Sequence, residues 1–336
     1  MPIRMLNNRH LTIELIQRCT LVCLCIVLFC SCGNNAGKKQ VEFKRFEQLL
    51  FGTPVDQLRQ VLTKEKATYQ CSLLNVYPED EGYMGMLEGF VTDPVMRDVY
   101  RISDSLYHDL GWLEDELGKA LTKAEKLCPA MQYNKFYTLI TGDFENYQSR
   151  VMCDDGVLAV SIDRYAVSEL GRYGYFGLPS YLVATSKREY IAADCMATIA
   201  RDHIVMPDGE ATVLDYAIAE GKVLYFLEQV LPDCADTIFL RYTGEQLEWM
   251  EGNLTNVWAW MIQNKMLYDT DLSRFHNLID EAPKTNAFGD GSAPRTPAYI
   301  GWQIVKRYMK KSGATMSELF EMTDSQRLLT ESGWRP

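Results

Sequence analysis

Glu220 is the residue whose type and surroundings point most clearly to chemistry, because it is an acid inside the apolar stretch from Ala211 to Leu231 (ATVLDYAIAEGKVLYFLEQVL). The stretch has helical periodicity, with Glu220 in the middle of its most apolar face and Lys222 on the opposite side. A buried carboxylate is costly unless it is paired, hydrogen-bonded, protonated or bound to a metal ion. Gly221 weakens the helix by about 1 kcal/mol relative to alanine, so we expect another segment to approach the backbone there.

Glu220 needs a cation or a hydrogen-bond donor, and Arg295, in a long loop towards the end of the chain, could supply it. Tyr299 and Gln303 follow on the next expected helix and could complete a buried polar pocket. His203 is a further candidate, although a lone histidine at helical spacing is also typical of a satisfied core residue. Two interpretations follow: a structural polar core that fixes the packing, or a pocket that binds a ligand.

The common catalytic motifs are missing from the sequence. Its four histidines are His10, His108, His203 and His276, and no two of them have the spacing of metal ligands. There is also no HExxH, GxSxG, Walker or GxGxxG pattern. We therefore expect no catalytic residue, no metal and no cofactor.

The elements that must position Glu220 begin with a helical layer in the N-terminal third. Apolar residues recur there with helical spacing, and Thr53-Pro54 and Asp93-Pro94 are typical helix starts. Helices are expected at 41–51, 53–69, 93–107 and 110–128, with a loop or weak helix at 77–89.

After the helical layer, β-branched and aromatic residues predict strands at 135–142 and 157–162, with Asp154-Asp155-Gly156 as a turn between paired strands. Thr243 and Gln246 form a capping box that opens a later helix. The other expected helices are 187–204, 211–231 and 297–313. The predicted fold class is α+β and mostly helical, with a small β-sheet packed against the Glu220 helix and one globular domain at 41–336.

The N-terminus has the features of a bacterial lipoprotein signal. Three arginines precede the apolar run Leu21 to Phe29, which is too short to span a bilayer, and Ser31-Cys32 follows it. We expect residues 1–31 to be removed, Cys32 to carry the lipid, and residues 32–40 to form a flexible tether. The alternative is an uncleaved membrane anchor; both interpretations tether the protein to a membrane.

Composition excludes some partners. Removing residues 1–31 takes away three basic residues and one acid, which changes the net charge from −11 to −13. Such an acidic body argues against binding nucleic acid or an anionic lipid surface. The five cysteines beyond the signal are scattered without a CxxC pattern, and their pairing stays open.

Two resemblances extend this reading. The segment AIAEGKVLYFL resembles the Glu-Gly helix that supplies the third metal ligand in gluzincin zinc peptidases. The preceding helix, however, reads YIAADCMATIARDHI where those enzymes carry HExxH. The resemblance therefore implies a degenerate zincin-like domain without the metal or the activity.

The second resemblance covers nearly all of the chain beyond the signal. The blocks RFEQLLF, VLDYAIAEGKVLYFLEQVLPD, RYTGEQLEWMEGNLTNVWAWMIQNKMLYDTD and PRTPAYIGWQIVKRYM are similar to the GldB family of gliding-motility lipoproteins of the Bacteroidetes. This implies a membrane-anchored, non-catalytic component or assembly factor of a cell-envelope machine, gliding or type IX secretion, with envelope proteins as partners. The alternative is a periplasmic, peptidase-like hydrolase with a divergent active site around Glu220.

The residues after Cys32 suggest where such a lipoprotein would lie. They contain neither the acidic tract of surface-exported lipoproteins nor an aspartate next to the cysteine. We expect an outer-membrane lipoprotein whose globular part faces the periplasm.

Overall fold

A computed structural model describes residues 37–142, 150–171, 178–271 and 275–336. The signal segment and Cys32 therefore lie outside the described residues. Gln40 to Pro336 forms one compact unit.

The N-terminal third is mainly helical, as predicted, but it begins with a strand. Phe43–Arg45 forms β1, and the expected helix at 41–51 starts only at Phe46 because the preceding residues pair with a strand about 90 residues further along. A 3-10 turn at Val55–Gln57 stands where Thr53 was expected to open a helix, and the region expected to be a loop or weak helix contains a regular one. The helices are α2 (Phe46–Gly52), α3 (Leu58–Tyr69), α4 (Glu81–Thr92), α5 (Pro94–Tyr107) and α6 (Gly111–Leu127).

The described residues form one four-stranded mixed sheet of order β1-β2-β4-β3. Strands β1 and β2 (Lys135–Leu139) are parallel, as are β2 and β4 (Val157–Ser161), whereas β3 (Val151–Asp154) runs antiparallel to β4. Every residue of β4 is buried, as expected of a central strand.

The predicted turn at Asp155-Gly156 joins β3 to β4, and not the two strands expected from the sequence. Both turn residues have positive φ angles, 45° and 72°, which suit a tight hairpin between antiparallel strands. Strand β3 was missed because it has only four residues, of which one is exposed and two are half-buried.

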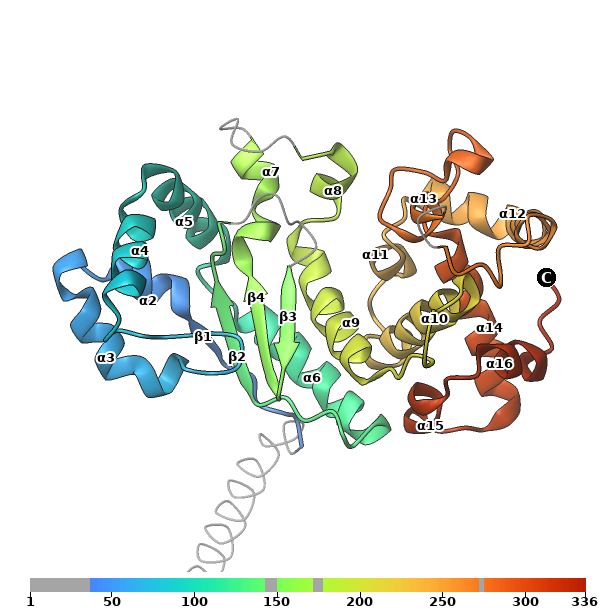
Figure 1. Cartoon of the computed structure of the whole chain (residues 1–336), viewed down its shortest axis with the longest axis horizontal. Helices are drawn as coiled ribbons and strands as arrows, with labels where there is room; N and C mark the ends of the chain where they lie inside the picture. Colours follow the sequence, from blue (N-terminus) through green and yellow to red (C-terminus); the bar gives the residue numbers. More distant parts are fainter. Residues whose placement is uncertain (1–36, 143–149, 172–177, 272–274) are drawn as a thin grey trace, which may run out of the picture. The chain divides into compact units, whose positions relative to one another are not determined.

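The Glu220 helix is separated from the sheet by another helix. Helix α9 (Ile191–His203) packs on β3, and α10 (Val213–Val230) packs on α9 and α6 (Figure 1). The expectation that the sheet packs against the Glu220 helix was therefore wrong, because α9 lies between them. Helix α10 opens with a capping box formed by Thr212 and Asp215.

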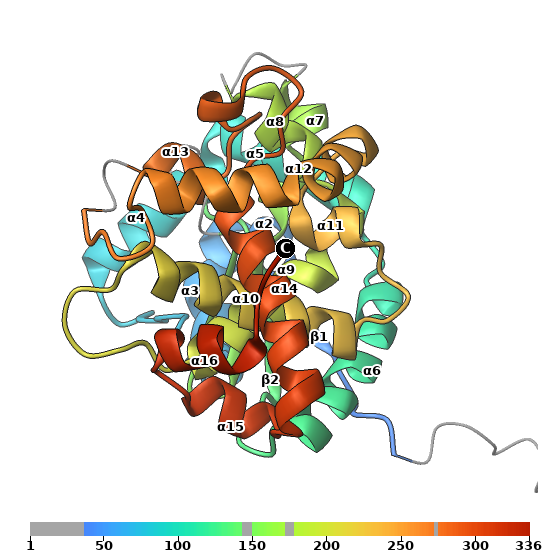
Figure 2. The same ribbon diagram turned by 90° about the vertical axis from the view of Figure 1, so that its right-hand side faces the viewer.

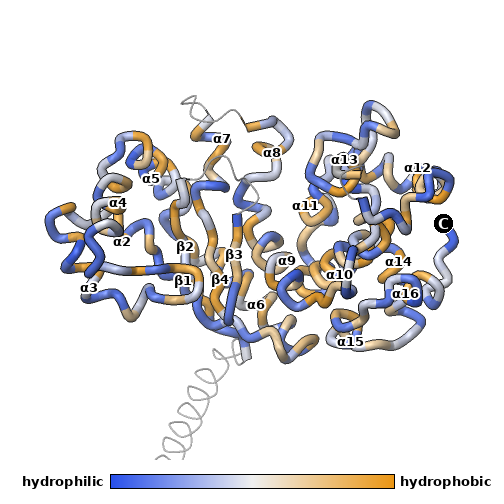
Figure 3. The backbone as a smooth tube through the Cα atoms, viewed as in Figure 1, coloured by the Kyte–Doolittle hydropathy of each residue, from blue (hydrophilic) through white to orange (hydrophobic). Residues whose placement is uncertain are grey.

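Helices α14, α15 and α16 pack on α10, α12 packs on α14, and these four helices face the viewer in Figure 2. Helix α14 crosses α10 in the largest helix contact of the described fold. Figure 3 shows hydrophobic residues concentrated on the strands and the inner helices, in agreement with the buried core. Besides α9 and α10, the helices that follow the sheet are α7 (Val167–Leu170), α8 (Ser180–Ala184), α11 (Asp236–Leu240), α12 (Gly244–Gln263), α13 (His276–Ile279), α14 (Thr296–Ser312), α15 (Met316–Glu321) and α16 (Ser325–Ser332).

Candidate functional site

A cavity of about 370 Å³ lies between α9, α10 and α11, with the segment around Glu281 and the start of α14 closing it. Its wall combines charged and apolar side chains. The charged residues are Arg150, Asp194, Arg201, Glu220, Arg241, Asp280, Glu281 and Arg295.

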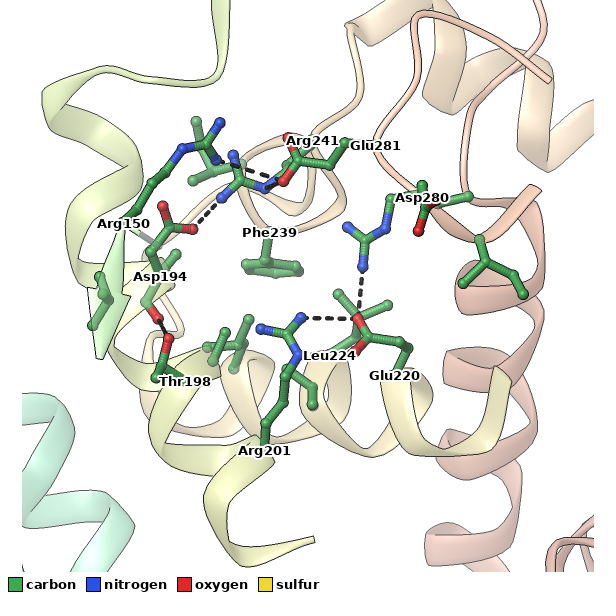
Figure 4. A pocket seen from close by; sticks show the side chains of 18 of the residues that line it. Arg150, Asp194, Thr198, Arg201, Glu220, Leu224, Phe239, Arg241, Asp280 and Glu281 are labelled. Carbon is green, nitrogen blue, oxygen red and sulfur yellow. Dashed lines mark hydrogen bonds and ion pairs between the residues drawn. The ribbon is translucent and has the colours of Figure 1, made fainter. Parts of the chain in front are cut away.

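Glu220 is held by two arginines (Figure 4). Arg201, on α9, donates from Nε to Oε1 and from Nη2 to Oε2, each at 2.9 Å. Arg295 donates from Nη2 to Oε2 at 2.6 Å. The side chain of Glu220 is 23% exposed, that of Arg295 is 11% exposed, and that of Arg201 is 49% exposed.

These contacts keep Glu220 ionised. Burial alone would raise the pKa of its carboxyl, but the charges and hydrogen bonds of Arg201 and Arg295 outweigh burial and lower the pKa to about 2. A carboxylate with so low a pKa and both oxygens engaged is a poor proton acceptor at neutral pH.

A second ion-pair cluster faces the first across the cavity, centred on Arg241. Arg241 pairs with Asp194 and Glu281, with Nε 3.1 Å from Oε1 of Glu281, and donates from Nη1 to the carbonyl of Thr185 at 3.1 Å. Arg150 adds a longer contact of 3.5 Å to the same Glu281 oxygen. The cluster joins α9 to the loop before α14, so it ties the cavity walls together.

The backbone aims Arg295 at Glu220. Arg295 is the N-cap residue of α14 and has a left-handed conformation with φ 50°, which is uncommon for a residue other than glycine. Left-handed residues cost of order 1–3 kcal/mol and often mark functional sites. The following Pro297 suits the first turn of the helix.

The structure brings Glu220 and Arg295 together, as the sequence suggested, but places the other three candidates elsewhere. Tyr299 stacks on Tyr242 with ring centroids 6.4 Å apart, His203 meets the Tyr133 ring edge-on, and Gln303 is half-buried. Among the described contacts, none of the three hydrogen-bonds to Glu220.

Sequence reasoning missed Arg201 and the Arg241 cluster. Arg201 lies two residues before His203 on α9, and helical periodicity sends residues two apart to different faces. The signal that could have found it was the need of Glu220 for a cation, because Arg201 is the only lysine or arginine on the preceding helix α9.

The helical wheel placed Lys222 on the polar side of its helix, and this interpretation was wrong. Lys222 is only 2% exposed and donates from Nζ to the carbonyl of Met322 at 2.6 Å. The side of α10 expected to face water is covered by the C-terminal helices, which a wheel of one helix cannot show.

Within the described ranges, no group of three or more histidine, cysteine, aspartate or glutamate side chains is arranged to hold a metal ion. None of the helices in those ranges is both long and apolar enough to cross a bilayer. The fold and cavity thus define a mostly helical α+β domain with an ion-paired internal site.

Comparison with known protein families assigns the chain to one of them. Residues 34–336 match the family described as gliding motility protein GldB, so the chain belongs to this family. It is a family of lipoproteins related to gliding motility. No curated protein and no solved structure gives a match. The zincin-like similarity expected from the Glu-Gly helix therefore has no support from a known structure.

Proposed function

We propose that this protein is a non-catalytic, lipid-anchored component or assembly factor of a gliding-motility machine and of the secretion machinery linked to it. The observation that carries the proposal is the family match over residues 34–336. A lipid on Cys32 would hold the domain at the membrane, and the short polar segment after it would act as the tether.

The chemistry of the cavity supports a binding or structural role over hydrolysis. Glu220 is the acid that a divergent peptidase would need, yet two guanidinium groups engage both of its oxygens. A general base must be free to accept a proton near the working pH. Among the residues that the structure describes, no contact in the cavity favours the hydrolase alternative.

The proposed location is the outer membrane, with the domain in the periplasm. The absence of an acidic tract after Cys32 and of an aspartate beside it supports this sorting. In that compartment the partners would be envelope proteins, recognised by the folded unit from Gln40 to Pro336.

The test is complementation of a deletion strain in a host that glides. Colony spreading and secretion of surface proteins are measured with the wild type, Cys32→Ala and Glu220→Gln, while immunoblots of membrane fractions report accumulation. Wild type should restore both activities, Cys32→Ala should stay unanchored and restore neither, and Glu220→Gln should restore them wherever it accumulates. A Glu220→Gln protein that accumulates normally but restores nothing would contradict the non-catalytic role.

A further inference from the structure

We infer that the cavity between α9, α10 and α11 is a binding site for a monocarboxylate with an apolar body, such as a small organic acid or the C-terminal residue of a peptide. The inference rests on three features of the wall: two guanidinium groups that share the one carboxylate of Glu220, guanidinium N–H groups left free, and an apolar floor.

Positive charge is concentrated at one end of the cavity. The whole wall is balanced, with four arginines and four acids, of which Asp280 is exposed. The surplus lies at Glu220, where two guanidinium groups share one carboxylate. One anion bound between Arg201 and Arg295 would neutralise this local surplus, whereas a dianion would exceed it by one negative charge.

The surplus charge comes with unused donors. Arg201 contacts Glu220 through Nε and Nη2, and Arg295 does so through Nη2. In the described part of the chain this leaves Nη1 of Arg201, together with Nε and Nη1 of Arg295, without a hydrogen bond. Because the side chain of Arg201 is half exposed, its free N–H groups are within reach of an entering carboxylate.

Apart from Thr198 and Tyr216, the rest of the wall is apolar. Val223, Leu224 and Leu227 from α10 and Ile238 and Phe239 from α11 line the cavity, and Figure 4 shows Phe239 between the two ion-pair clusters. A volume of about 370 Å³ is at the lower end of the range for small-molecule pockets. The chemistry that fits is a carboxylate at the Arg201–Arg295 end with an aliphatic or aromatic group over Phe239.

The test measures binding to the full chain, purified in detergent, by isothermal titration calorimetry. The probes are N-acetyl-leucine, its uncharged relative N-acetyl-leucinamide, acetate, inorganic phosphate and the peptide N-acetyl-Ala-Ala-Leu. N-acetyl-leucine should bind at least tenfold more tightly than the amide or acetate. A tighter peptide points to a chain terminus as the natural ligand, and an equal or weaker one points to a free acid.

Two variants connect binding to the cavity. Arg201→Gln should weaken N-acetyl-leucine at least tenfold, while the exposed Arg327→Gln on α16 should leave its affinity unchanged. Glu220→Gln removes the internal competitor for the two arginines, so it should bind the ligand several-fold more tightly even if the fold is less stable. No binding to the wild type, equal binding of phosphate, or weaker binding to Glu220→Gln would each overturn the inference.

Discussion

Gly221 on α10 lies against Gly301 on α14, so closely that neither residue has room for a side chain. A Cβ atom on Gly301 would lie 1.7 Å from the carbonyl oxygen of Ala217, and one on Gly221 would lie 2.2 Å from the carbonyl carbon of Gly301. The crossing positions α14, and therefore its N-cap residue Arg295, over the helix that carries Glu220. The close approach expected from Gly221 is thus part of how the Glu220–Arg295 pair is assembled.

Gly301→Ala should be strongly destabilising. The added methyl group can be accommodated only by moving two backbones apart, and overpacking of this kind costs about 3 kcal/mol. Urea unfolding followed by circular dichroism would measure the loss. The control is Gly252→Ala on α12, where an added Cβ meets nothing within 4 Å and where alanine should be neutral or stabilising by up to about 1 kcal/mol. Equal stabilities of the two variants would refute the backbone contact.

The Glu220 pair should make stability depend on acidity. The pKa of Glu220 is lowered to about 2 from 4.5, so its contribution is present above pH 4.5 and is lost as the pH falls towards 2. The stability difference between wild type and Glu220→Gln should therefore shrink by about 2 kcal/mol between pH 5.5 and pH 3.

The exposed Glu331→Gln on α16 is the matched control for this measurement, since its side chain is 43% exposed and contacts Arg327 at the surface. Its difference from the wild type should stay small throughout. A difference between wild type and Glu220→Gln that did not change with pH would show that the two arginines leave the acid unperturbed.

Lys222 should make the stability of the protein depend on pH in the alkaline range. Burial lowers its pKa to about 8 from 10.5, so the unfolded chain binds the proton more tightly than the folded protein does. Stability should then rise by about 1 kcal/mol per pH unit between pH 8 and pH 9. Lys222→Met should remove this rise, as measured by urea unfolding at the two pH values. A rise of the same size in the variant would assign it to another group.

The five described cysteines are all unpaired and should differ in reactivity. Burial raises the pKa of Cys153 and Cys234 to about 11 and that of Cys195 well above its usual value, which suppresses the reactive thiolate. A maleimide applied to native protein should label Cys71 fastest and leave Cys195 unlabelled until urea is added. Mass spectrometry of digested samples would map the sites, and rapid labelling of Cys195 would contradict its complete burial.

Local elements of this fold were largely predictable. The helix expected at 211–231 runs from Val213 to Val230, and the capping box at Thr243 and Gln246 is present. Helical spacing, caps and proline positions act within a few residues, so the sequence displays them directly. The need of Glu220 for a cation was equally visible, because burying an unpaired carboxylate is costly in any fold.

What the sequence by itself determined was therefore most of the longer helices, the acid that needed a partner and the glycine that needed a close neighbour. Only the tertiary structure decided that Phe43 pairs with Phe136, that Arg201 joins Arg295 on Glu220, and that Lys222 is buried. These outcomes depend on which surfaces meet after residues far apart in the chain come together. A periodicity within one segment carries no information about the segment that will cover it.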